Sequence, residues 1–246
     1  NYNIYDGFVV LHGSDTMSYT ASALSFMLEN LTKPVIFTGS QLPIGDLRTD
    51  AKENLITSIQ IASLHKDNKP VITEVGLYFE YKLYRANRTT KVNAEHFEAF
   101  DSLNYPPLII SGVNLSVHFP VLLKPNWNKK LVVHKNFESN ILLVKMFPGI
   151  NEEAINYLFS YPNLKGLVLE TYGSGNLTNK TWFLKAIKKI TNKNIPVINV
   201  TQCFGGSVDM SIYNPNKEYR TIGIISGKDI TTEAAITKLM LMLGQN

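Results

Sequence analysis

A hydroxyl and a carboxylate stand side by side at the end of the first apolar run of this chain. Ser14 and Asp15 follow Gly13, and the apolar run Phe8–Leu11 comes just before them. Residues 18–31 then carry apolar side chains at the spacing of one helix face. The pair therefore lies where a buried strand leads into a helix. In open α/β sheets this edge binds ligands, and the helix start offers free N–H groups.

Side chains of these types suit amide cleavage. A Ser or Thr hydroxyl is a weak acid that needs a base, and a Lys amine can serve if its neutral form is accessible. A carboxylate can hold that Lys in place, and oxyanion donors complete the set. The alternative is structural, because Ser, Asp and Thr are also common N-cap residues of helices. The pattern at residues 14–16 leaves both interpretations open.

The elements that position these side chains indicate an α/β fold. In the first part of the chain, strands are predicted at Phe8–Leu11, Val35–Phe37 and Val71–Val75, and helices at Ser18–Leu31 and Asp50–Leu64. The second helix is predicted to bury Leu55, Ile59 and Ala62. This alternation favours a parallel sheet with helices packed on it. After Val75 the rhythm changes, and residues 78–100 carry many polar and aromatic side chains without a clear period.

The alternation returns after a stretch that Pro120, Pro125 and Asn126 interrupt. Strands are predicted at Ile141–Val144, Leu167–Leu169 and Ile195–Val200, and helices at Asn151–Ser160, Thr178–Ile190 and Thr231–Leu243. We therefore predict two α/β domains. The larger N-terminal domain, with a parallel-type sheet, spans residues 1–118, a linker spans 119–138, and a smaller parallel-sheet domain spans 139–246.

Composition and charge are those of an ordinary globular protein. The 246 residues are 44% hydrophobic and 18% charged, with a formal net charge of +4. The basic residues are dispersed, and no apolar segment approaches the roughly 20 residues that span a bilayer. Cys203 is the only cysteine, so an oxidising compartment is not implied. No His, Cys and carboxylate cluster has metal-ligand spacing. We expect no metal, no cofactor, and no nucleic-acid or membrane partner.

Short motifs follow one another along the chain in a fixed order. They are His12-Gly13-Ser14-Asp15-Thr16, Ala21-Ser22-Ala23-Leu24-Ser25-Phe26-Met27-Leu28-Glu29-Asn30, Lys33-Pro34-Val35-Ile36, Thr38-Gly39-Ser40-Gln41, Tyr84-Arg85, Asn87-Arg88-Thr89-Thr90-Lys91 and Thr201-Gln202-Cys203. Together they resemble the cytoplasmic, type I branch of the L-asparaginase family, whose signature reads His-Gly-Thr-Asp-Thr. Matches spread this widely are more specific than any single motif, and nearly all 246 residues share in the resemblance.

The resemblance implies catalytic roles for three side chains far apart in the sequence. The family's Thr-Asp-Lys trio corresponds by motif position to Ser14, Asp15 and Lys91, and Asp15 is also implied to hold the substrate's α-ammonium group. Ser14 stands where the family has Thr. The hydroxyl is kept, but the β-methyl that restricts its rotamer is not, so we expect weaker preorganisation and retained chemistry. Without the resemblance, Lys91 would be one of many solvated lysines.

Three more residues are implied to bind substrate. Gly13 belongs to the signature, and Ser40 is implied to orient the scissile amide through its main chain, although a plain strand-to-helix turn is the alternative. Asn176, in the Gly-rich loop 172–176, is implied to complete the site of a neighbouring subunit. Some type I members also bind asparagine at a regulatory site that uses an Arg. This chain has Glu170 there, so we expect that site not to be kept.

The resemblance implies hydrolysis of L-asparagine to L-aspartate and ammonia by a cytoplasmic homodimer or homotetramer. The family forms its acyl-enzyme on a Thr of a Thr-Gly-Gly-Thr segment that this sequence does not contain. We therefore expect the chain to be a fragment that shows little activity alone. Two alternatives stay open, namely a non-catalytic amino-acid-binding relative and the asparaginase-like subunit of a tRNA-dependent amidotransferase. The sequence does not decide between asparagine and glutamine.

Overall fold

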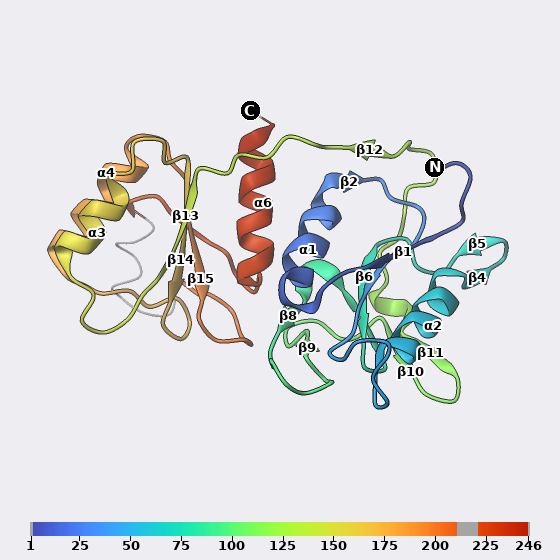
Figure 1. The fold of residues 1–246 in the computed structure, drawn as a ribbon. Helices are drawn as coiled ribbons and strands as arrows, with labels where there is room; N and C mark the ends of the chain where they lie inside the picture. The colour runs from blue at the N-terminus through green and yellow to red at the C-terminus, as the bar shows by residue number, and fades with distance from the viewer. Residues whose placement is uncertain (1, 211–220, 246) are drawn as a thin grey trace. The chain divides into compact units, whose positions relative to one another are not determined.

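The computed structural model describes residues 2–210 and 221–245, which belong to two compact units (Figure 1). Unit 1 is Asn1–Lys135 and unit 2 is Asn136–Asn246. Each unit is built on its own sheet with helices packed against it. The predicted fold class, two α/β domains with the larger one first, is confirmed, and the sheet of the first unit is mixed.

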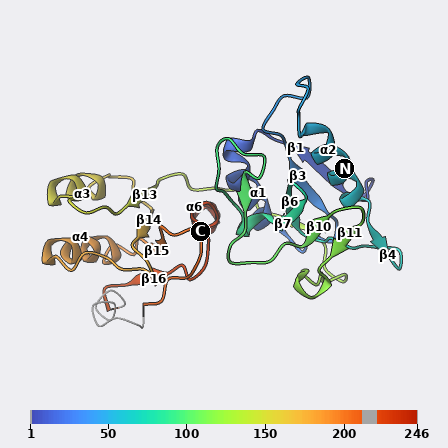
Figure 2. The same cartoon turned by 90° about the horizontal axis from the view of Figure 1, so that it is seen from below.

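Unit 1 is organised around a six-stranded sheet with the order β1-β3-β6-β7-β10-β11 (Figure 2). The strands are β1 (Phe8–Leu11), β3 (Val35–Thr38), β6 (Val75–Phe79), β7 (Lys82–Arg85), β10 (Ile109–Ser111) and β11 (Leu115–Val117). The first three run parallel, and each later strand is antiparallel to its neighbour. The parallel part corresponds to the predicted alternation, and hairpins extend it on one side.

Smaller elements complete unit 1. Two-residue strands pair as β2 (Leu28–Glu29) with β12 (Val132–Val133), β4 (His65–Lys66) with β5 (Lys69–Pro70), and β8 (Thr90–Lys91) with β9 (Phe100–Asp101). The helices are η1 (Ser14–Thr16), α1 (Met17–Met27), α2 (Ala51–Ala62), η2 (Ala86–Arg88) and η3 (Phe119–Val121). The segment 119–138 therefore contains η3 and β12, and β12 joins it to unit 1.

The two long helices of unit 1 pack on opposite faces of its sheet. Met17 of α1 belongs to the same apolar cluster as Phe37 of β3, whereas Ile61 of α2 packs in the cluster that contains Ile36. Neighbouring side chains of a strand point to opposite faces, so β3 serves both clusters. Its four residues are all buried, as expected of a parallel strand covered on both sides.

Unit 2 is a parallel four-stranded sheet with helices on both faces (Figures 1 and 2). Its strands, in spatial order, are β13 (Ile141–Lys145), β14 (Gly166–Thr171), β15 (Val197–Thr201) and β16 (Ile224–Ser226). The helices α3 (Glu152–Phe159) and α4 (Thr181–Thr191) cover one face, and α6 (Thr232–Gly244) covers the other. Asn151 and Thr231 cap α3 and α6 through their side chains, which explains why both helices begin close to where they were predicted.

The helix predicted at Ser18–Leu31 extends too far at its C-terminal end. The α-helix stops at Met27, and the next two residues pair with β12 as a short strand. Asn30 then adopts a left-handed conformation with φ 61°, which no helix accommodates. Leu31 is nevertheless buried, so a loop residue produced part of the apparent helical period.

The strand predicted at Val71–Val75 is also wrong, because the third parallel strand is β6 and begins where the prediction ended. Residues 78–100, which lack a clear period in the sequence, contain the end of β6 and all of β7, and these two strands form a hairpin. Its turn residues Glu80 and Tyr81 have φ values of 44° and 66°. A two-residue hairpin with both central φ values positive matches the twist of the strands. Neither turn residue is glycine, so the usual sequence signal was missing.

The buried face of α2 differs from the prediction. Ile59 is 53% exposed, whereas Asn54, Ser58 and Ile61 are buried. The prediction holds for Ala62, which is buried, whereas Leu55 is half-buried. It is wrong for Ile59, since the buried face instead includes Asn54. Its side-chain amide donates to the main-chain oxygen of Gly39, 3.0 Å away. The helix thus uses a polar side chain to support the loop after β3.

Candidate active site

The carboxyl ends of β1 and β3 bring two polar loops together. The strands are parallel and in register from Phe8–Val35 to Leu11–Thr38, so the residues after each strand end at the same edge. A Cβ atom added at Gly39 would collide with the main-chain oxygen of His12. Only glycine allows the two loops to approach this closely.

Lys91 reaches the same edge from β8. Its amine donates to Ser14 Oγ at 2.9 Å and forms an ion pair with Asp15 Oδ1 at 2.8 Å. The three side chains that the sequence placed at positions 14, 15 and 91 are therefore in direct contact. The Lys91 side chain is 18% exposed and that of Asp15 is 93% exposed, so the amine is sheltered while the carboxylate faces solvent.

Packing behind Lys91 explains its position. Lys91 pairs with Phe100 of β9, and the ring of Phe100 packs at a tilt against that of Phe79 of β6, with the ring centroids 5.0 Å apart. Upstream, Ala86 of η2 is fully buried, and its main-chain oxygen accepts a hydrogen bond from Ser22 of α1 at 3.4 Å. These contacts fix β8 beside the start of α1, where η1 presents Ser14 and Asp15.

The capping interpretation of residues 14–16 does not describe these side chains. Gly13 is the N-cap of η1 and Thr16 the N-cap of α1, and neither makes a side-chain capping hydrogen bond. The Ser14 hydroxyl and the Asp15 carboxylate bond to side chains from other elements instead. Both groups therefore face a shared polar site and do not close the helix end.

Asp15 is held in its ionised form. The hydrogen bond from Lys91, followed by the charge of Lys91, lowers the pKa of the Asp15 carboxyl below its ordinary value. The contact is therefore present at and above the ordinary Asp pKa, and it is lost as the pH falls through the lowered pKa. Because Asp15 is exposed, water weakens the attraction, and the ion pair serves mainly to orient the amine.

The titration of Asp15 gives a direct test of this contact. Replacing Lys91 by Met removes both the donor and the positive charge, so the pKa of the Asp15 carboxyl is expected to rise to near its ordinary value. NMR titration of the Asp15 side-chain carboxyl in the two proteins measures the change. The contact would be absent in solution if both proteins gave the same titration midpoint.

Sequence reasoning missed Gln41 and Asp50. The Ser14 hydroxyl donates to Gln41 Oε1 at 3.1 Å. Asp50, buried before α2, accepts hydrogen bonds from the main-chain N–H groups of Gln41 and Leu42. Asn54 donates to Asp50 at 3.2 Å as well as to the Gly39 oxygen. The only sign of this interaction in the sequence was an acidic residue, Asp50, nine positions after Gln41, the last residue of the Gly-Ser-Gln turn.

The remaining residues predicted in unit 1 lie along the same edge. Gly13 is exposed, and a Cβ atom there would meet no atom within 4 Å, so its main chain borders open space. Ser40 is half-buried between Gly39 and Gln41, in the loop that Asp50 holds. Their roles in binding substrate stay predictions.

Asn176 lies in unit 2, in a loop with a defined structure. Its main-chain N–H donates to the oxygen of Tyr172 at 2.8 Å, and Gly173 and Gly175 have positive φ values of 48° and 103°. The buried Asn199 side chain donates to the Gly175 oxygen at 3.0 Å. The turn is thus fixed by its own unit and leaves Asn176 half-buried at its end.

Glu170 is engaged in unit 2. Its carboxylate accepts a hydrogen bond from Thr232 at 2.6 Å and lies 3.9 Å from the Lys145 amine. The side chain is 16% exposed. A negative charge that is mostly buried and already paired is a poor partner for a substrate carboxylate, so the loss of the regulatory site stays a prediction.

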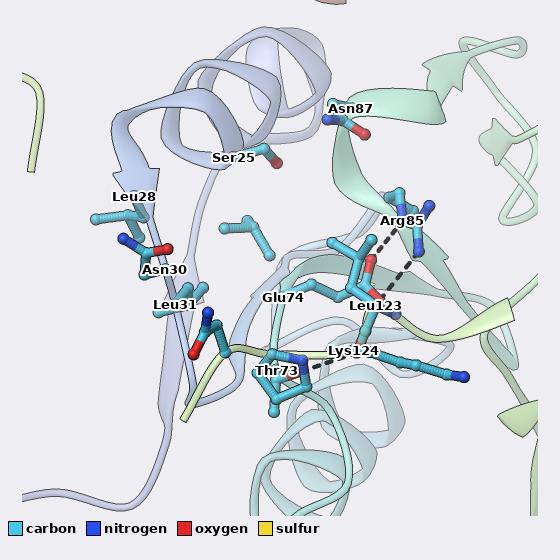
Figure 3. A pocket seen from close by; sticks show the side chains of 13 residues that line it. Ser25, Leu28, Asn30, Leu31, Thr73, Glu74, Arg85, Asn87, Leu123 and Lys124 are labelled. Carbon is cyan, nitrogen blue, oxygen red and sulfur yellow. Dashed lines mark hydrogen bonds and ion pairs between the residues drawn. The ribbon is translucent and has the colours of Figure 1, made fainter. Parts of the chain in front are cut away.

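A pocket of unit 1, of about 280 Å³, is lined by a different set of residues (Figure 3). It is lined in part by Asn30, Thr73, Glu74, Arg85 and Lys124 and by none of the predicted site residues. Figure 3 shows Arg85 bonded to Glu74, whose carboxylate also accepts the Leu123 N–H at 2.9 Å. These bonds fix the segment after η3 to the sheet, which is a structural role.

Removing the Arg85 side chain tests that role. Glu74 and Arg85 are only 3% and 13% exposed, and breaking a buried ion pair leaves an uncompensated charge. Arg85→Met is expected to reduce the free energy of unfolding by about 3–5 kcal/mol, measured by urea denaturation. Arg48→Met, at an exposed position, is the control and should change it little. Equal stability of the two variants would contradict the assignment.

The described residues show no metal site and no membrane span. Within residues 2–210 and 221–245, no group of three or more His, Cys, Asp and Glu side chains is arranged to hold a metal ion. In the same part of the chain, no helix has both the length and the apolar character to cross a membrane.

Comparisons with known proteins match the whole chain. Residues 1–121 match the family model described as "Asparaginase, N-terminal", and residues 140–246 match "Glutaminase/Asparaginase C-terminal domain". L-asparaginase 1 of Escherichia coli strain K12 is 44% identical over 246 residues, which cover 100% of this chain and 70% of that protein. The 60 kDa lysophospholipase of Mus musculus is 42% identical over 245 residues, which cover all of this chain and 42% of its own length.

A solved structure agrees with the fold. The crystal structure of L-asparaginase I from Vibrio cholerae O1 biovar eltor is similar to this chain with a TM-score of 0.90 and 42% sequence identity. The similarity covers 100% of this chain and 72% of that one. Both α/β units and their order are therefore shared with a protein of known structure.

Proposed function

Because the chain belongs to the asparaginase family, we propose that this protein hydrolyses the side-chain amide of L-asparagine to L-aspartate and ammonia. The observation that carries the proposal is the Lys91 amine, which lies 2.9 Å from Ser14 Oγ and 2.8 Å from Asp15 Oδ1. An alcohol, an amine and a carboxylate in one chain of contacts can move a proton to or from a reacting group.

Each side chain of this set has a proposed role. Lys91 exchanges a proton with the reacting group, and the Ser14 hydroxyl accepts a hydrogen bond from the amine and holds it in place. Asp15 holds the Lys91 amine through one oxygen. Because the Asp15 carboxylate is otherwise exposed, it can also bind the α-ammonium group of the substrate. We do not assign the nucleophilic Thr that the family resemblance implies to a residue of this chain.

The main chain of Gly13 and of Ser40 is proposed to bind the substrate beside this trio. Gly13 borders open space, and Ser40 lies in the loop whose next residue, Gln41, is held by Asp50. Asn176 is proposed to contribute to the active site of a neighbouring subunit. This role accompanies a homodimer or homotetramer in the cytoplasm, which the family resemblance supports.

Ammonia release tests the proposed function. The protein translated from the complete reading frame is incubated with L-asparagine, and ammonia and aspartate are measured. Equal amounts of the two products are expected. Binding of asparagine without release would instead indicate an amino-acid-binding relative, and release that depends on a second subunit would indicate an amidotransferase. L-Glutamine assayed in parallel defines the substrate range.

A further inference from the structure

The Gln41 side chain has one possible orientation in this structure. Its amide nitrogen donates to the main-chain oxygens of Ala94 and His96, at 3.1 Å and 3.0 Å. Only the nitrogen end of a glutamine amide can donate to two carbonyl groups. The oxygen end must therefore point the other way, and it meets the Ser14 hydroxyl at 3.1 Å.

This orientation fixes the direction of the Ser14 hydroxyl. The hydroxyl has one proton, which it donates to Gln41 Oε1, and it has two lone pairs, one of which accepts the Lys91 amine. The donors therefore run in one direction, from Lys91 to Ser14 to Gln41 and on to the loop at residues 94–96. Rotation of Ser14 about χ1 would break both of its hydrogen bonds.

The anchoring of Gln41 makes it suitable for this task. Its main-chain N–H donates to both oxygens of the Asp50 carboxylate, at 3.1 Å and 2.9 Å. Asp50 is 8% exposed and also accepts from Asn54. The residue is thus held at its main chain by α2 and at its side chain by the loop after β8, so Oε1 has little freedom to move.

We propose that Gln41 is a positioning residue that holds the Ser14 hydroxyl in reach of Lys91, a role that rests on the proposed function. Serine has three staggered χ1 rotamers, and a β-branched threonine is more restricted. In this chain, the acceptor on Gln41 supplies the restriction that a methyl group would otherwise give. Gln41 acts through Ser14 and has no contact with the reacting atoms in this role.

A double-mutant cycle separates this role from a structural one. Gln41→Met keeps the length of the side chain and removes the amide, and it is made both with Ser14 present and in the Ser14→Thr protein. With Ser14 present, kcat is expected to fall about tenfold and KM to change little. In the Ser14→Thr protein, the same change is expected to cost less than about threefold, because coupled neighbours are not additive. Gln60→Met, at an exposed position on α2, is the control.

The structural alternative predicts a different result. If Gln41 only holds the loop at residues 94–96, its loss lowers kcat by the same factor in both backgrounds, and the proposal is overturned. An unchanged kcat in Gln41→Met overturns it as well. Crystal structures of Gln41→Met give a readout that needs no activity, since Ser14 Oγ is expected to leave Lys91. That readout decides the role of Gln41 even if the unsubstituted protein releases no ammonia, a result that would contradict only the proposed function.

Discussion

Replacing Lys91 by Met is expected to lower kcat/KM for L-asparagine by about 10²–10⁴-fold, the range that a positioned acid or base contributes. The amine is the only group that touches both Ser14 Oγ and Asp15 Oδ1 among the contacts described for this site. Methionine has a similar length and no proton to exchange. The Ser14 hydroxyl would keep its acceptor, Gln41, and lose the hydrogen bond that it accepts from Lys91.

The fold is expected to survive this substitution. Lys91 is partly exposed and its main-chain pairing with Phe100 does not depend on its side chain, so the thermal unfolding midpoint should be close to that of the unsubstituted protein. Lys52→Met, on the exposed side of α2, removes the same charge away from the site and should keep full activity. An active, folded Lys91→Met protein would remove Lys91 from the mechanism.

The strands and helices that the sequence predicted well are those whose ends carry a local signal. The side-chain caps at Asn151 and Thr231 define the starts of α3 and α6. Errors arose where distant contacts decided the structure. The end of α1 depends on the pairing of β2 with Val132–Val133, more than 100 residues away, and no periodicity within residues 18–31 contains that information.

The buried side of α2 shows the same limit. Hydrophobic periodicity favoured burial of Ile59, yet Asn54 is inside because it bonds to Asp50 and to the Gly39 oxygen. A polar side chain is buried at low cost only when its hydrogen bonds are satisfied. Its partners come from the loop after β3, so the preference for Asn54 over Ile59 appears only once the two elements are in place.

The candidate site divides in the same way. Ser14 and Asp15 were identified by their position after a buried strand, which is a local property. Lys91 was identified only through the resemblance of its motif, because nothing in its neighbours distinguishes it from a solvated lysine. Gln41 was quoted in a motif but given no role. Its role depends on the orientation of its amide, which the carbonyl groups of Ala94 and His96 determine.

Asp15 has two proposed roles, holding the Lys91 amine and binding the substrate's α-ammonium group, and these can be tested separately. Asp15→Asn keeps the shape of the side chain and removes its charge. The Lys91 amine then loses its ion-pair partner, and a substrate α-ammonium group loses its anion. A misplaced catalytic group alone can cost about 10²-fold, so kcat/KM for L-asparagine is expected to fall by about 10²-fold or more.

A substrate without the α-amino group distinguishes the two functions of Asp15. Succinamate has the same carboxamide as asparagine and lacks the ammonium group. If Asp15 binds that group, the unsubstituted protein prefers asparagine strongly, and Asp15→Asn loses most of this preference as KM for asparagine rises. If Asp15 only orients Lys91, the substitution lowers kcat for both substrates by the same factor and leaves the preference intact. Since Lys91 occupies only Oδ1 and the carboxylate is 93% exposed, room remains for a second cation, and loss of the preference is the expected result.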